Sequence, residues 1–221
     1  MHARITGWGK YLPERVLTNR DLEKTVDTSD EWIETRTGIR ERRILGDDEA
    51  ASTMAVAAGR RALEVAGLSP QQLDMVIVAT SSPDRIMPAT AALVQNELGA
   101  EGAAAFDVNA ACSGFIYALI TAYQFIAAGA CKSILVVASE AVSRSIDWED
   151  RSTCVLFGDG AGAVVVQANG DVTDMLSFVM GNDGSGAELL YVPHPCGLPK
   201  NTHDDKRYSM IMDGKNVFRF G

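Results

Sequence analysis

The residues with the clearest chemical potential surround Cys112, in the stretch FDVNAACSGFIYAL at residues 106–119. The cysteine lies where a short strand-like run meets a long apolar run with the character of a helix. A thiol at a helix N-terminus faces unpaired backbone N–H groups and the helix dipole, which favour the thiolate. Small neighbours such as Ala111 and Gly114 permit a tight turn and the approach of a thioester. A buried structural thiol is the alternative, because free cysteines are commonly buried.

A second candidate is the basic stretch TRTGIRERR at residues 35–43, in a chain whose formal net charge is −9. An anionic ligand would need a local basic patch of this kind. The arginines concerned are Arg36, Arg40, Arg42 and Arg43. The alternative is a solvated loop whose charges partly pair with each other, because Glu34 and Glu41 are interleaved.

The glycine-rich string GDGAG at residues 158–162 invites comparison with phosphate-binding loops. No Lys-Ser or Lys-Thr follows it, and a dinucleotide fingerprint would be followed by a helix instead of the strand-like AVVVQA. We therefore expect a structural turn in which the glycines let the chain reverse tightly against the core.

A metal site is not predicted. His194, Cys196 and His203 are close in sequence, but their spacing matches no standard set of ligands. A polar surface loop is the expected structure there.

Composition and charge limit the class of protein. The 221 residues, 47% of them hydrophobic, are enough for a large domain with a substantial core. The acidic balance argues against nucleic acid or an anionic membrane as a partner. Four cysteines without a CxxC pair indicate free thiols in a reducing cytoplasm, and the N-terminus lacks a secretory signal. The uncharged segment from Val108 to Cys131 is long enough to span a membrane, but its scattered polar residues favour a fully buried helix.

Short runs rich in Val and Ile alternate with helical patterns. Strands covered on both faces are predicted at 75–80, 104–108, 133–139 and 163–168. Helices are predicted at 52–68, 88–99 and 112–129, the first capped by Ser52 and closed by Gly67, and a single turn is predicted at 69–74. This alternation predicts an α/β fold in which helices cover the faces of a mostly parallel sheet.

Four stretches of the sequence together resemble one family. They are VDTSDEWIETRTGIRERRI (26–44), FDVNAACSGFIYAL (106–119), DRSTCVLFGDGAGAVVV (150–166) and MDGKNVFRF (212–220). In this order and spacing they are similar to 3-oxoacyl-[acyl-carrier-protein] synthase III (β-ketoacyl-ACP synthase III) of the thiolase superfamily. The resemblance implies a thiolase-like layered αβαβα fold. Residues 1–169 would form its complete N-terminal half, and residues 170–221 would begin the C-terminal half.

The resemblance also implies an activity, that of the acyltransferase that starts fatty-acid synthesis. Cys112 would take an acyl group, expected to be acetyl, from acyl-CoA, and malonyl-acyl-carrier protein would lose CO2 to give the carbanion that attacks the new thioester. The backbone N–H of Cys112 would be one donor to the oxyanion. CoA is then part of a substrate, so no cofactor is expected. A homodimer is also implied.

The family's adenine site matches four positions in this sequence. By resemblance, adenine would lie between Trp32 and Arg151, with Thr28 and Arg36 nearby. An indole ring and a guanidinium group can both stack on an aromatic base. A tryptophan in the core is the structural alternative for Trp32, although the acidic residues before it indicate an exposed setting.

The rest of the implied substrate site lies later in the chain. By resemblance, Leu156, Phe157 and Phe218 would wall the acyl pocket, and Gly214 would also contact substrate. Met87 occupies the position from which the partner subunit closes this pocket. A flexible methionine there would admit acyl groups other than acetyl.

The family's catalytic histidine and asparagine have no counterpart among these residues. YVPHP around His194 is superficially similar to the family's proline-histidine context, but it precedes MDGKNVFRF and is assigned no catalytic role. We expect the chain to be part of a longer synthase, because the helix after Cys112 would otherwise leave an apolar face exposed. The alternatives are another thiolase-fold acyltransferase or condensing enzyme, including one that uses acyl-CoA as both partners, and a non-catalytic CoA-binding or dimerising module.

Overall fold

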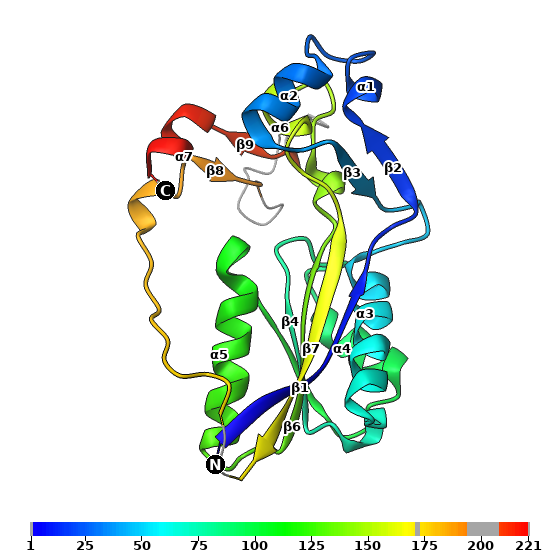
Figure 1. Cartoon of the computed structure of the whole chain (residues 1–221), viewed down its shortest axis with the longest axis vertical. Coiled ribbons are helices and arrows are strands. Elements are labelled where there is room, and N and C mark those ends of the chain that lie inside the picture. Colours follow the sequence, from blue (N-terminus) through cyan, green and yellow to red (C-terminus); the bar gives the residue numbers. More distant parts are fainter. Residues whose placement is uncertain (1, 171–172, 194–207, 221) are drawn as a thin grey trace. The chain divides into compact units, whose positions relative to one another are not determined.

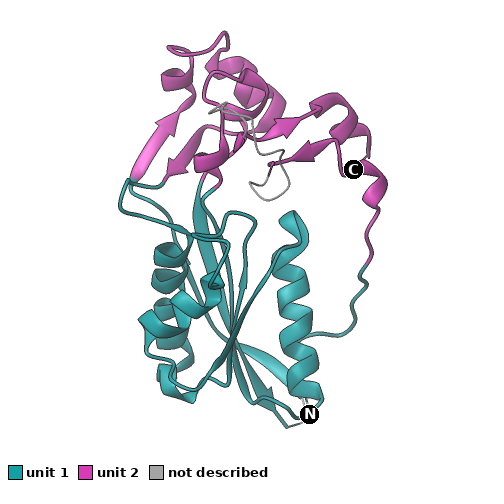
Figure 2. Cartoon of the chain, turned by 180° about the vertical axis from the view of Figure 1, so that it is seen from behind, with its two compact units in different colours: residues 1–14, 45–141, 159–180 teal, residues 15–44, 142–158, 181–221 magenta. Residues whose placement is uncertain are grey.

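The computed structural model describes residues 2–170, 173–193 and 208–220. The chain forms two compact units (Figure 2). Unit 1 comprises residues 1–14, 45–141 and 159–180, and unit 2 comprises residues 15–44, 142–158 and 181–221. Each unit therefore draws on three separate stretches of the chain.

Unit 1 is built on a five-stranded sheet. The strand order is β1 (His2–Tyr11), β7 (Gly160–Asn169), β6 (Ser133–Glu140), β4 (Met75–Ala79) and β5 (Ala104–Val108). β4 runs parallel to β5 and β6, whereas β7 runs antiparallel to β6 and β1. The four predicted strands are confirmed. β1, β4, β5 and β6 run in the same direction, so the prediction of a mostly parallel sheet holds except at β7, which runs opposite to both of its neighbours. Between β6 and β7 the chain forms the 3-10 turn η3 (Val142–Ser145) and the one-turn helix α6 (Arg151–Cys154).

Helices cover both faces of this sheet (Figure 1). α3 (Ala51–Ala66) and α4 (Thr90–Leu98) pack on one face, and α5 (Gly114–Ala127) packs on the other. Alternate residues of a strand point to opposite faces, so Val76 and Val78 of β4 join the core under α3 while Met75 and Ile77 join the core under α5. The predicted α/β class is confirmed.

Glycines close the helices as the sequence predicts. Gly67 and Gly99 follow α3 and α4 in the left-handed conformation, with φ of 67° and 74°. The prediction that Ser52 caps the first helix is wrong, because α3 begins at Ala51 and the backbone N–H and hydroxyl of Ser52 donate to Asp84 instead. The predicted single turn is confirmed as η1 (Pro70–Gln72).

Strand β1 contains two glycines for a packing reason. A Cβ on Gly7 would lie 2.1 Å from the carbonyl oxygen of Ala62, and a Cβ on Gly9 would lie 2.2 Å from that of Ala58. Both distances are far below contact distance, so only glycine lets α3 lie this close to β1.

Helix α5 differs from the fully buried helix that the sequence predicts. Ala118, Ala122 and Ile126 are buried against the sheet, but Ile116 and Phe125 are exposed. The lack of charged residues therefore does not mean that the described residues cover every side of the helix. No helix in the described residues is both long enough and apolar enough to cross a membrane.

Unit 2 has a smaller core and shorter elements. β2 (Arg15–Thr18) pairs antiparallel with β3 (Glu41–Ile44), next to α1 (Asn19–Leu22) and α2 (Asp30–Thr37). Further along the chain are α6, η4 (Gly184–Gly186), the paired strands β8 (Leu190–Tyr191) and β9 (Ile211–Met212), and α7 (Gly214–Phe220). The buried residues of its core cluster are Leu22, Ile33, Ile146, Cys154 and Val155.

The GDGAG string leads into strand β7, which begins at Gly160, and not into a helix. Within unit 1, the carboxylate of Asp159 accepts a hydrogen bond of 2.8 Å from the backbone N–H of Leu45. Within unit 2, a Cβ on Gly158 would lie 3.0 Å from the carbonyl oxygen of Arg43. These contacts agree with a structural role for the string, but the predicted turn is wrong, because residues 160–162 are the start of strand β7.

Candidate active site

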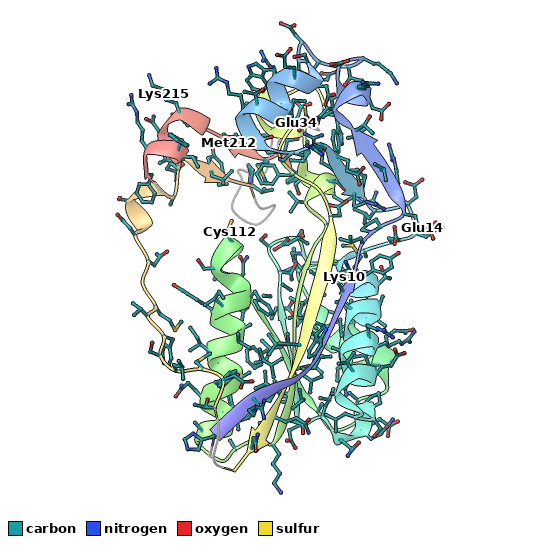
Figure 3. The ribbon with its side chains drawn as sticks, viewed as in Figure 1. Lys10, Glu14, Glu34, Cys112, Met212 and Lys215 are labelled. Carbon is teal, nitrogen blue, oxygen red and sulfur yellow. The ribbon has the colours of Figure 1, made fainter. Side chains whose placement is uncertain are left out.

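Cys112 lies between a strand and a helix, as the sequence predicts. Strand β5 ends at Val108, the 3-10 turn η2 (Ala111–Ser113) follows, and α5 begins at Gly114. The thiol is exposed at this end of α5 (Figure 3). The alternative of a buried structural thiol is therefore wrong.

The backbone directly before Cys112 is strained. Ala111 has φ of 44°, a left-handed conformation that residues with a Cβ rarely adopt. Such a conformation costs about 1–3 kcal/mol and persists where the surrounding structure holds it, often at functional sites. A sharp strand-to-helix turn also exposes the nucleophile of α/β-hydrolases.

Two features hold this turn in place. A Cβ on Gly114 would lie 3.3 Å from the Cβ of Ala79, so the glycine lets the first turn of α5 approach the end of β4. On β5, the carboxylate of Asp107 accepts hydrogen bonds of 2.7 Å from the backbone N–H groups of both Thr90 and Ala91, at the start of α4. The sequence analysis missed Asp107, although a carboxylate within the apolar run AAFDV was a visible signal.

The other two described cysteines have different environments. Cys131 and Cys154 are buried, and burial raises the pKa of both thiols. A raised pKa keeps a thiol protonated and poorly reactive at neutral pH. Among the described cysteines, only Cys112 is accessible to a substrate.

Met87, in the segment between β4 and α4 of unit 1, is 78% exposed. At the start of this segment, the carboxylate of Glu140 accepts hydrogen bonds from the backbone N–H of Ser81 and from the hydroxyl of Ser82. The segment is therefore fixed to the end of β6, while Met87 stays largely exposed within the described part of the chain.

In unit 2, the structure brings Trp32 and Arg151 together. The hydroxyl of Ser29 caps α2 by accepting a hydrogen bond of 3.1 Å from the backbone N–H of Trp32. The indole is 38% exposed, and the guanidinium carbon of Arg151, from α6, lies 4.2 Å from the centre of its ring. Trp32 is therefore not a core residue, and it stacks directly on Arg151, so adenine between them stays a prediction.

Two polar atoms of the predicted adenine site lack hydrogen-bond partners. The Oγ1 of Thr28 and the Nε of Arg151 are both buried without a partner among the described residues. Buried polar groups in proteins are nearly always satisfied, so these two are available to a polar ligand.

The predicted basic patch is only partly present. Arg42 is buried, so its inclusion in a surface patch is wrong. Arg40 pairs with Glu34 at 2.8 Å and Arg43 pairs with Glu41 at 3.3 Å, which confirms the alternative of a partly self-paired loop. Of the four arginines, only the exposed Arg36 lacks a polar partner within the described part of the chain.

The remaining predicted site residues lie on other parts of unit 2. Leu156 and Phe157 are half-buried and pack against the small core. Gly214 begins α7, where an added Cβ would lie 3.4 Å from the methyl group of Met212. Phe218, on the same helix, is 89% exposed. Among the described residues of this unit, Phe218 therefore has little packing that would define a pocket wall.

No cluster of three or more metal-ligating side chains occurs among residues 2–170, 173–193 and 208–220. His194, Cys196 and His203 lie outside the described residues.

Comparison with known proteins gives concordant results. The family model for 3-oxoacyl-[acyl-carrier-protein (ACP)] synthase III matches residues 106–184. The chain is 50% identical over 220 residues to β-ketoacyl-[acyl-carrier-protein] synthase III of Xanthomonas campestris, an alignment that covers 100% of this chain and 67% of the relative.

Solved structures agree. A 3-oxoacyl-[acyl-carrier-protein] synthase III from Aquifex aeolicus has a TM-score of 0.89 and 51% identity, covering 99% of this chain and 67% of that one. The priming β-ketosynthase of a polyketide biosynthetic pathway has a TM-score of 0.92 and 42% identity, covering 99% of this chain and 65% of that one. The chain thus spans about two thirds of the length of these relatives.

The mixed sheet, its helical layers and these similarities define an acyltransferase of the condensing type with a thiolase-like fold. Within that class, the chain belongs to the 3-oxoacyl-[acyl-carrier-protein] synthase III family, the condensing enzymes of fatty-acid synthesis.

Proposed function

We propose that Cys112 is the nucleophile of this chain and accepts an acyl group from acyl-CoA. The observation that carries this proposal is the exposed thiol behind the strained Ala111, at the start of α5. The sulfur attacks the thioester carbonyl, a new carbon–sulfur bond forms, and the CoA thiolate leaves with the proton that Cys112 gives up. The backbone N–H of Cys112 is one donor to the oxyanion.

The second half of the reaction consumes the acyl-cysteine. Malonyl-acyl-carrier protein loses CO2, its carbanion attacks the thioester carbonyl, and the thiolate of Cys112 leaves. The product is a 3-oxoacyl group on the carrier protein. The acyl-CoA we favour is acetyl-CoA, and CoA acts only as the leaving group of a substrate, so the reaction uses no separate cofactor.

Trp32 and Arg151 bind the adenine of CoA in this proposal, with Thr28 and Arg36 beside them. The stacked pair, the two unpartnered polar atoms and the unpaired charge of Arg36 support this assignment. Leu156, Phe157, Gly214 and Phe218 contact the acyl and pantetheine portions.

Met87 closes the acyl pocket of a second copy in a homodimer, which its exposure supports. The enzyme works in the cytoplasm, without nucleic-acid or membrane partners. Residues 1–169 form the N-terminal half of the thiolase-like fold, and residues 170–221 begin the C-terminal half.

The test is transfer of the acetyl group from acetyl-CoA to malonyl-acyl-carrier protein, measured as the release of free CoA. Cys112→Ala should abolish release, whereas Cys131→Ala, at a buried thiol, should retain it. Equal CoA release by the Cys112→Ala variant and the unaltered protein would show that another group is the acyl acceptor.

A further inference from the structure

We propose that Asn19 and Arg42 are positioning residues that hold Trp32 and Arg151 in register for the nucleotide of acyl-CoA. This inference rests on the proposed function, in which those two side chains bind adenine. Asn19 and Arg42 act through the helices that carry the stacked pair.

The two residues form a buried chain of hydrogen bonds within unit 2. Arg42 is 4% exposed and Asn19 is 1% exposed. The Nη1 of Arg42 donates to the Oδ1 of Asn19 at 2.6 Å, and its Nη2 donates to the carbonyl oxygen of Val155. The Nδ2 of Asn19 donates to the Oδ1 of Asp30 and to the carbonyl oxygen of Ile39, both at 2.8 Å.

These hydrogen bonds connect one end of each of the two helices that carry the stacked side chains. Asp30 is the first residue of α2, which carries Trp32, and Val155 is the C-cap of α6, which carries Arg151. α6 has four residues, a length that is not stable without support from its surroundings. Arg42 supplies that support at one of the carbonyl groups that a helix end leaves unsatisfied.

The charge of Arg42 shows that this support has an electrostatic cost. Its guanidinium donates to neutral oxygens, its Nε has no partner among the described residues, and burial lowers its pKa. Arg42 connects to the carboxylate of Asp30 only through the amide of Asn19, which accepts from Arg42 and donates to Asp30. A hydrophobic side chain would fill the same space without this cost. It could not donate hydrogen bonds to two acceptors in a fixed geometry, as the planar guanidinium does.

The inference predicts an effect that depends on the nucleotide. Arg42→Lys keeps the charge but can donate along only one of the two directions. It should raise the KM for acetyl-CoA about tenfold, the loss expected for one hydrogen bond to a charged group, with kcat unchanged. Acylation of Cys112 by acetyl-pantetheine, which lacks the nucleotide, should proceed at the unaltered rate. Arg15→Lys, the same change at an exposed residue of β2, is the matched control.

A second variant keeps the test decisive if Arg42→Lys fails to fold. The Asp30 side chain is partly exposed. Asp30→Ala removes the carboxylate at the other end of the hydrogen-bond chain. It should raise the KM for acetyl-CoA about threefold to tenfold, again with no change for acetyl-pantetheine.

The failure of this inference differs from the failure of the proposed function. If Trp32→Ala removes the preference for acetyl-CoA over acetyl-pantetheine and the positioning variants do not alter it, the inference is wrong and the adenine site stands. Equal losses with both thioesters would show a general structural role and also overturn it. If neither thioester acylates the unaltered protein, the proposed function fails, and the inference fails with it.

Discussion

The stacking of Arg151 on Trp32 leads to a quantitative prediction for CoA binding. The 4.2 Å between the guanidinium carbon and the ring centre leaves no room for a third ring between them. The two side chains must separate to admit adenine. Arg151→Ala removes one face of the resulting sandwich and also removes the contact that has to be broken.

The two effects oppose each other, and their sizes decide the result. An Arg–Trp contact at a partly exposed site is worth about 0.5–1 kcal/mol. Stacking of a base on an aromatic or guanidinium face is worth about 1–3 kcal/mol per base. Arg151→Ala should therefore lose about 1 kcal/mol or more of binding free energy, which weakens CoA binding about fivefold. Trp32→Ala removes the larger face and should weaken binding by more.

The assay is calorimetric titration with CoA, with pantetheine as the ligand that lacks adenine. Arg15→Ala, which removes an exposed arginine of β2, is the control and should leave the dissociation constant unchanged. Tighter CoA binding by Arg151→Ala would show that the contact only blocks the slot. An unchanged dissociation constant for both variants would show that adenine binds elsewhere.

Three further predictions concern reactivity and stability. Alkylation by iodoacetamide at neutral pH, followed by peptide mapping, should modify Cys112 much faster than the buried Cys131 and Cys154; comparable rates would contradict the assigned burial. Gly9→Ala should destabilise the protein severely, since its Cβ would meet the carbonyl oxygen of Ala58 at 2.2 Å; an unchanged urea midpoint would show that α3 can move away. The urea midpoint should also fall as the pH rises above the ordinary thiol pKa of 9.0. Burial raises the pKa of Cys131 and Cys154 in the folded state, so these thiols ionise more readily once the protein unfolds. A midpoint that rises with pH in this range would contradict the raised pKa values.

The elements that bury apolar side chains on both faces were predictable from sequence. The runs at 75–79 and 133–140 contain Val, Ile and Ala in a pattern that fits few other structures, and the glycines after α3 and α4 are visible stop signals. β1 was missed because Gly7 and Gly9 are unfavourable in strands, and only the close approach of α3 explains them.

The site was predictable in its residues but not in its backbone or burial. The order of residues around Cys112 indicated a strand, a turn and a helix. The positive φ of Ala111 follows from the surrounding packing, and no residue type signals it. Likewise, Arg42 looks like its neighbours in TRTGIRERR, and it is buried because β3 turns alternate side chains inward and outward.

The most direct test of the central claim is the intact mass of the protein before and after incubation with acetyl-CoA, followed by mapping of the modified peptide. The account predicts the addition of one acetyl group, located on Cys112. An acetyl group on a different residue, or no addition with acetyl-CoA or with longer acyl-CoAs, would contradict the assignment of Cys112 as the acyl acceptor.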